Sequence, residues 1–312
     1  MPSPRRPVQN LLQKLLMLPL LLLSPADMPA HASTTAAVST YRIDTRVINE
    51  SSGLARSQRR SDLLWTLNDS GGDAALYGIT THGHHAVTLQ LQGDQVGNID
   101  WEDLSSYRRD GHDYVLIGDM GDNFAFRSSL VFYLIREPRL GHLPARVRNL
   151  PVSVQQRYEV IYPDGARDAE ALAVDGRENM AYVISKRAER PALYRFSLRP
   201  GQTMPITLEK LAEIDIPRAP ADYPGNPNSF NWVTAMDFDD ALDRAYVGTL
   251  TTGYFYDRRP DESWAQALSR PPRAFDLPEF PQIEGGCFGR RQRDTVYISS
   301  EQLPARMARL RP

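Results

Sequence analysis

A short pattern occurs five times in this chain of 312 residues. In each copy an acidic or hydroxyl-bearing residue precedes two small or apolar residues, and a strand-like segment ends 16 or 17 positions later. The first residues of the copies are Ser52, Glu102, Glu170, Thr234 and Glu284. The paired ends are Asp69, Asp119, Lys186, Leu250 and Glu301. A constant spacing that recurs along a chain indicates a repeat architecture.

The segments between these positions have the composition of strands. They are short and rich in aromatic or β-branched residues, at 63–67, 114–117, 181–184, 245–247 and 295–298. Third and fourth strands follow most of them, for example at 131–135 and 152–161. Units of four antiparallel strands are typical of β-propeller blades. The sequence therefore predicts an all-β fold in which residues 41–312 form a single β-propeller domain.

Five copies of the pattern favour five blades. Only 28 residues follow Glu284, so we expect the alternating segment 41–48 to supply the outer strand of the last blade and close the ring. Six blades are the alternative if the Pro-rich insertion 217–227 hides a degenerate blade. A β-sandwich is a further alternative, but it does not explain the constant spacing.

The first residues have the features of an export signal. Arg5, Arg6 and Lys14 precede an apolar run at 15–23, and the small-x-small sequence Ala-His-Ala ends at residue 32. We predict a signal peptide at 1–32, a flexible N-terminus at 33–40 and an exported protein, either periplasmic or secreted. The run is too short for a stable membrane span, although an uncleaved anchor is the alternative. We expect no transmembrane segment after cleavage.

Composition limits the possible partners. The formal net charge of −2 argues against a nucleic-acid partner. Cys287 is the only cysteine, so the chain cannot form an internal disulfide. We expect a monomer that binds a small molecule or a protein.

The repeated acidic residues are the main candidates for a functional site, because the innermost strands of a propeller line its central channel. Converging carboxylates repel one another and raise each other's pKa, and a hard divalent cation relieves that repulsion. We predict a Ca²⁺ or Mg²⁺ site, without an organic cofactor, formed by Glu102, Asp103, Asp168, Glu170 and Glu284. The other channel or rim candidates are Glu50, Asn68, Asp69, Asp100, Asp119, Asp122, Asn123 and Glu301. A purely structural role, in which the acids tie neighbouring blades together, is the alternative.

The chain has no G-x-S-x-G, H-E-x-x-H, P-loop or dinucleotide-binding motif. We therefore favour a ligand- or protein-binding, or scaffold, module with an acidic central channel. The alternative is a divalent-metal-dependent hydrolase acting on phosphoesters or lactones. In that case Lys186 is the candidate catalytic residue, because its ammonium group could stabilise developing negative charge.

Several stretches together resemble a group of exported bacterial β-propeller proteins of largely uncharacterised function. They lie at 52–55, 64–71, 100–104, 117–123, 136–138, 168–172, 183–186, 233–235 and 282–285. More distantly, the repeat is similar to the phytase-like and the gluconolactonase/paraoxonase-like propellers. That resemblance implies a Ca²⁺ ion in the channel and hydrolysis of phosphoesters or lactones.

Overall fold

The computed structural model describes residues 37–312, apart from 144–145 and 189. The predicted signal peptide at 1–32 and residues 33–36 lie outside the described residues. Within this range the fold is all-β, and the described helical segments are the short α1 (Trp264–Leu268) and the 3-10 turn η1 (Pro227–Ser229). No described helix has the length and apolar character that a membrane span requires.

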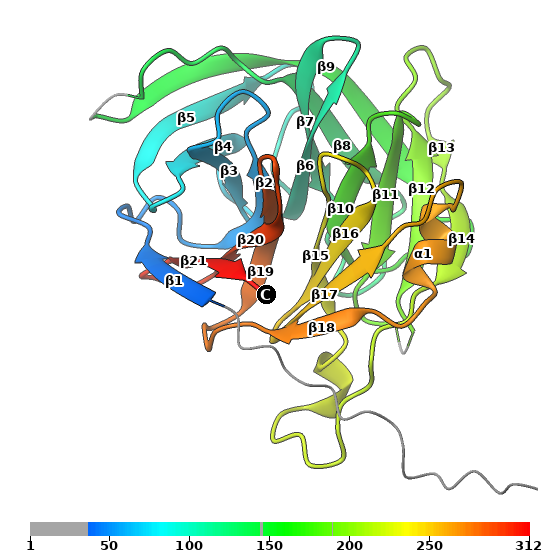
Figure 1. Ribbon diagram of the computed structural model, residues 1–312. Coiled ribbons are helices and arrows are strands. Elements are labelled where there is room, and N and C mark those ends of the chain that lie inside the picture. Colours follow the sequence, from blue (N-terminus) through cyan, green and yellow to red (C-terminus); the bar gives the residue numbers. More distant parts are fainter. Residues whose placement is uncertain (1–36, 144–145, 189) are drawn as a thin grey trace, which may run out of the picture. The chain divides into compact units, whose positions relative to one another are not determined.

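The strands pair into four-stranded antiparallel arrays, which we interpret as blades (Figure 1). The first array contains β2 (Ser51–Arg56), β3 (Leu63–Asn68), β4 (Ala75–Thr80) and β5 (His85–Gln92). The second contains β6 (Trp101–Arg109), β7 (His112–Asp119), β8 (Leu130–Arg136) and β9 (Arg148–Ile161). The third contains β10 (Ala169–Asp175), β11 (Met180–Ser185), β12 (Ala192–Ser197) and β14 (Glu209–Glu213). The fourth contains β15 (Val233–Phe238), β16 (Arg244–Thr249), β17 (Thr252–Asp257) and β18 (Arg273–Asp276).

The last array joins the two ends of the described chain. It contains β19 (Ile283–Gly289), β20 (Gln292–Ser300), β21 (Arg306–Arg311) and β1 (Ala37–Arg42). Strand β1 pairs with β21 from Ala37 opposite Arg311 to Arg42 opposite Arg306. The N-terminal segment thus adds the outermost strand of this array, as the five-blade hypothesis requires.

The position of that strand corrects two predictions. We expected a strand at 41–48 and a flexible segment at 33–40, whereas β1 covers 37–42. Ile43 and Ile48, which follow the strand, are buried in the core. The chain leaves the sheet at Asp44, whose backbone N–H donates to the Gly83 carbonyl and whose carboxylate accepts from the His85 N–H.

The long strand β9 links the first two arrays into one sheet. Its first half pairs in parallel with β5, and its second half pairs antiparallel with β8. The two-residue strand β13 (Ile206–Thr207) adds a short parallel pairing at the end of β9.

The first strand of each array lies at the centre. Contacts run from β2 to β6, β6 to β10, β10 to β15, β15 to β19 and β19 back to β2. Figure 1 shows these strands in the middle of the ribbon diagram, with β5, β9, β14 and β18 farther out. The inner strands approach closely: a Cβ atom on Gly53 of β2 would lie 2.7 Å from the Cα of Asp103 on β6.

The hydrophobic core fills the spaces between neighbouring arrays. Fully buried Trp65, Trp101 and Trp264 are among the largest side chains there, and the Trp264 and Phe238 rings stack with their centroids 3.8 Å apart. Full burial of such a side chain contributes on the order of 1.5–3 kcal/mol. The segment 217–232, between β14 and β15, contains η1 and no strand, so the six-blade alternative finds no strands there.

Candidate metal and ligand site

A repeated backbone irregularity presents the predicted first-column residues. In every inner strand the regular pairing with the second strand is interrupted by a β-bulge at this position. For example, Trp101 pairs with Asp119 and Asp103 with Gly118, which leaves Glu102 as the extra residue. A β-bulge turns a side chain out of the normal alternation. The bulged residues are Glu102, Glu170, Thr234, Glu284 and, together with Gly53, Ser52.

Three of these side chains meet in the interior. Glu102, Glu170 and Glu284 each offer a carboxylate oxygen, and these oxygens lie within 4.8 Å of one another. All three residues are at most 6% exposed. The Ser52 hydroxyl donates to Glu102 Oε2 at 3.0 Å. We call these three glutamates the acidic cluster.

Lys186, which follows β11, enters this cluster. Its ammonium group forms an ion pair with Glu170, and its Nζ atom lies 3.4 Å from Glu284 Oε1. Burial alone would lower the pKa of Lys186, but Glu170, Glu284 and Glu102 together raise it above its ordinary value. Lys186 is therefore a permanent positive charge, and it does not fit the role of a proton-exchanging group.

A second group of acids adjoins the cluster through Glu102. Asp69, Asp100 and Glu102 each offer an oxygen within 4.8 Å of the others. Gly121 packs directly against this group, since a Cβ atom there would overlap the carboxylate oxygens of Glu102 and Asp100. We call Asp69, Asp100 and Glu102 the rim triad.

Apart from Glu170 Oε2, which forms the ion pair with Lys186, two buried oxygens near these groups have no hydrogen-bond partner among the described residues. They are Asp69 Oδ1 and Glu301 Oε1. Glu301 is only 8% exposed, and its other carboxylate oxygen accepts from Gln282 Nε2 at 2.9 Å. An unpaired buried polar atom costs roughly 1–3 kcal/mol unless a ligand satisfies it.

The pKa values of these acidic residues show that their carboxyl groups are buried close to one another. Burial, with the charges of Asp100 and Glu284, raises the pKa of Asp69 to about 7. Burial, with the charge of Glu284, raises the pKa of Glu301 to about 9. Burial is also the main reason why the pKa values of Glu102 and Glu170 lie well above their usual range. Protons or a cation must therefore compensate charge that Lys186 leaves unbalanced.

The rim triad fits a hard cation. Its donors are carboxylate oxygens, which Ca²⁺ and Mg²⁺ prefer. Two oxygens on opposite sides of a Ca²⁺ ion are separated by about 4.6–5.2 Å, twice the usual Ca–O distance. The separations within the triad do not exceed 4.8 Å, so one ion could contact all three carboxylates.

Two predicted metal ligands do not join these groups. Asp103 is fully buried and accepts backbone N–H bonds from Leu104 and Leu172 at 2.8 Å and from Met236 at 3.5 Å. It therefore ties β6 to β10 and β15. Asp168 pairs with Arg187 at 2.6 Å and accepts from the Asp122 N–H at 2.9 Å. Both carboxylates have the structural role that we gave as the alternative.

Most other candidates organise loops near the two carboxylate groups. Asp119 pairs with Arg127 at 2.8 Å, and Asp122 accepts the backbone N–H groups of Phe126 and Arg127. Asn123, Asn68 and Glu50 also lie outside the acidic cluster and the rim triad. The Asn123 side chain contacts Arg187, Asn68 bonds to the backbone of residues 47, 49 and 50, and Glu50 is exposed.

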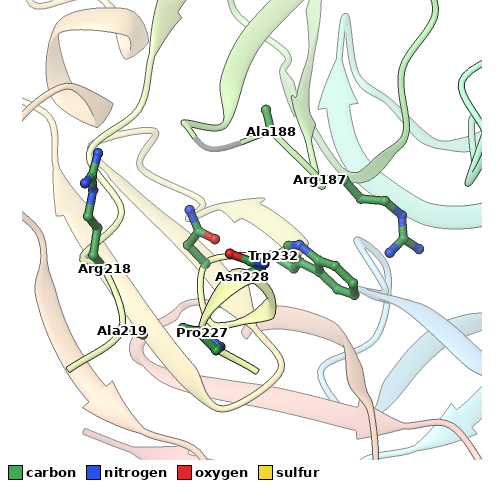
Figure 2. Close-up of a pocket in the computed structure, with 8 residues that line it drawn as sticks. Arg187, Ala188, Arg218, Ala219, Pro227, Asn228 and Trp232 are labelled. Atoms are coloured by element: carbon green, nitrogen blue, oxygen red, sulfur yellow. The ribbon is translucent and has the colours of Figure 1, made fainter. Parts of the chain in front are cut away.

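A pocket that the sequence analysis did not identify opens beside the cluster (Figure 2). It has a volume of ≈ 550 Å³, and its lining includes Arg187, Arg218, Asn228, Asn231 and Trp232. Trp232 connects it to the cluster, because the indole lies 4.4 Å from the Arg187 guanidinium and 5.8 Å from Lys186 Nζ. Figure 2 shows the Trp232 ring beside the Arg187 side chain. The available signal was the insertion 217–227, which ends just before these asparagines and the tryptophan.

Fold and site together define a β-propeller with a buried acidic centre on its inner strands. A luciferin-regenerating enzyme is one of the solved structures similar to this chain, at 10% identity and a TM-score of 0.43, covering 88% of this chain and 96% of that one. No family model and no curated protein matches the sequence. The resemblance to exported bacterial, phytase-like and gluconolactonase/paraoxonase-like propellers therefore stays a prediction.

Proposed function

We propose that this protein is an exported β-propeller that binds a divalent cation and a small polar ligand at the acidic end of its channel. The observation that carries the proposal is the convergence of Glu102, Glu170 and Glu284 on one ammonium group, with Asp69 and Asp100 beside them.

Charge balance supports the cation. The acidic cluster, the rim triad and Glu301 contain six carboxyl groups, and Lys186 is the basic residue that forms ion pairs with them in the described chain. Lys186 compensates the negative charge of Glu170 and Glu284. The triad then remains as the place where a Ca²⁺ or Mg²⁺ ion would reduce repulsion. Asp69 Oδ1, which has no partner among the described residues, offers such an ion a lone pair.

The adjoining pocket supports a polar ligand. Its lining combines a tryptophan face, asparagine amides and arginine guanidinium groups. Such groups recognise a flat or ring-shaped molecule that carries hydroxyl or anionic oxygens. A ligand seated on Trp232 would reach Lys186 and the acidic cluster, so one molecule could contact both features. The predicted signal peptide is in accord with a site that operates outside the cytoplasm.

Thermal unfolding in EDTA, Ca²⁺ and Mg²⁺ tests the cation. The wild-type protein should melt at a higher temperature with one of the two ions than with EDTA, because an ion that binds only the folded state stabilises it. Glu102→Gln, which alters both carboxylate groups, should lose this shift. Glu279→Gln is the matched control, since Glu279 is exposed and outside both groups. Equal melting temperatures for wild-type protein in EDTA and in either ion would refute the cation.

A metal-dependent hydrolase is the second candidate. The observation in its favour is the buried Lys186 ammonium group beside the carboxylates, because a fixed positive charge could stabilise negative charge that develops on a substrate. A bound divalent ion would supply Lewis acidity next to it. Phosphoester and lactone substrates test this reading: hydrolysis that is lost in both Glu102→Gln and Asp69→Asn supports an enzyme. Ion binding without turnover of any substrate supports the binding function.

A further inference from the structure

The opposite end of the channel has the reverse charge. The bulged residue of each inner strand lies near the first residue of that strand. The turn that follows the strand lies at the strand's opposite end. On β6, Glu102 and Arg108 are six residues apart, or about 20 Å along an extended strand. The turns at this far end surround a second pocket of ≈ 610 Å³, to which all five arrays contribute.

Arginines dominate the lining of this second pocket. They are Arg56, Arg108, Arg109, Arg177, Arg290 and Arg291. The acidic residues in the lining are Asp110, Asp239 and Asp240. Asp237 and Asp113, outside the lining, pair with Arg56 and Arg108, so the excess of positive charge rests on the other arginines. The excess gathers at the mouth of the channel, because the turn after β10 supplies Arg177 and the turn between β19 and β20 supplies Arg290 and Arg291.

The arginines differ in how many ion-pair and hydrogen-bond partners the protein itself provides for their guanidinium groups. Arg56 is 4% exposed and held in place by Asp237, Asp240 and the Phe238 carbonyl. In contrast, the guanidinium groups of Arg290 and Arg291 have no ion-pair or hydrogen-bond partner among the described residues. Arg177 donates to the Ala241 carbonyl and forms no ion pair within the described chain. Three guanidinium groups from two arrays therefore keep donors available for a ligand.

We infer that this pocket is an anion site for a small molecule that carries two or more phosphate or carboxylate groups. A guanidinium group presents paired N–H donors that match the oxygens of either group. The volume lies within the range of small-molecule pockets. The ligand needs several negative charges because arginines on separate turns line the same pocket. The inference is independent of the acidic end and of the function proposed for it.

Calorimetric titration with pyrophosphate and with citrate, at constant ionic strength, tests the inference. The two probes separate phosphate from carboxylate recognition. Wild-type protein should bind at least one of them, and the double variant Arg290→Ser/Arg291→Asn should bind it roughly tenfold more weakly or worse. Arg177→Ser should weaken binding in the same direction. Asparagine is chosen at 291 because this residue has a positive φ of 56°.

Two control variants test whether the loss of anion affinity arises at the second pocket. Arg46→Ser removes one positive charge, as Arg177→Ser does, from an exposed residue in the loop before β2, and it should leave the affinity unchanged. Glu102→Gln, at the acidic end, should also bind normally, which shows that the probe is not captured through a cation there. Melting curves verify that each variant is folded. Absence of binding by both probes, or equal affinity in the wild type and the double variant, would overturn the inference.

Discussion

The Nζ atom of Lys186 lies 3.4 Å from Oε1 of Glu284, although the two residues are 98 positions apart in the sequence. Lys186 follows the second strand of one array, and Glu284 lies on the first strand of another. Because Lys186 also pairs with Glu170, it joins inner strands that are not neighbours in the ring of contacts. A side chain at the centre of the molecule therefore stabilises several arrays at once.

Replacing Lys186 with methionine should destabilise the protein by about 3 kcal/mol or more. The change leaves buried carboxylates without their counter-charge, and breaking a buried ion pair on one side typically costs that much. Denaturant unfolding measures the difference. Lys210→Met is the matched control: the Lys210 pair with Asp164 is partly exposed, so the loss should stay below about 1 kcal/mol. Equal losses in the two variants would contradict the central role of Lys186.

The variant Asp103→Asn tests whether Asp103 has a structural role or is a ligand of the cation. It removes the oxygen that accepts from Leu172 and Met236, so buried N–H groups lose their acceptor. The expected loss of stability is about 2–6 kcal/mol, from roughly 1–3 kcal/mol for each of the two unsatisfied groups. Calcium affinity measured on the folded variant should stay within about twofold of the wild type. A large drop in affinity would return Asp103 to the set of ligands.

Gly121→Ala should weaken cation binding while the protein remains folded. The added methyl group would displace the carboxylate ends of Glu102 and Asp100, which are flexible enough to move. We expect roughly a tenfold loss of calcium affinity in a calorimetric titration. Gly141→Ala is the control, because a Cβ atom at Gly141 meets no other atom within 4 Å. Unchanged affinity in Gly121→Ala would mean that the rim triad does not hold the ion.

Without divalent ions, the protein should become less stable as the pH rises from 6 to 9. Asp69 and Glu301 have folded-state pKa values of about 7 and about 9, whereas in the unfolded chain both lie near 4, at about 3.9 and 4.3. Between about pH 4 and 9 the folded state therefore binds more protons, and its stability falls as these groups ionise.

Urea unfolding in EDTA at pH 6 and pH 9 measures this dependence. The midpoint should be lower at pH 9, and Glu301→Gln should reduce the difference because the glutamine cannot ionise. A midpoint that is constant or higher at pH 9 would show that the acidic groups are not crowded in the folded protein.

The all-β fold could be predicted because its signals are local. Strands such as β7 and β11 contain short β-branched and aromatic runs, and the spacing from Glu102 to Asp119 or from Glu170 to Lys186 reflects one hairpin repeated. The predicted second-strand segments all fall within observed strands.

The choice between neighbouring acids could not be predicted. Glu102 and Asp103 are adjacent, yet the bulge turns Glu102 into the acidic cluster while Asp103 binds backbone N–H groups. A bulge depends on the pairing between two strands and leaves no clear mark in one of them. The pocket at Trp232 was missed for a similar reason, because an irregular insertion has no period from which its position could be inferred.

The most direct test of the proposed cation site is a calorimetric titration of Ca²⁺, and separately of Mg²⁺, into EDTA-treated and dialysed full-length protein. We predict saturable binding of one ion per chain, lost in Glu102→Gln and retained in Glu279→Gln. Absence of binding by both ions, or binding that Glu102→Gln leaves unchanged, would contradict a cation site at the rim triad.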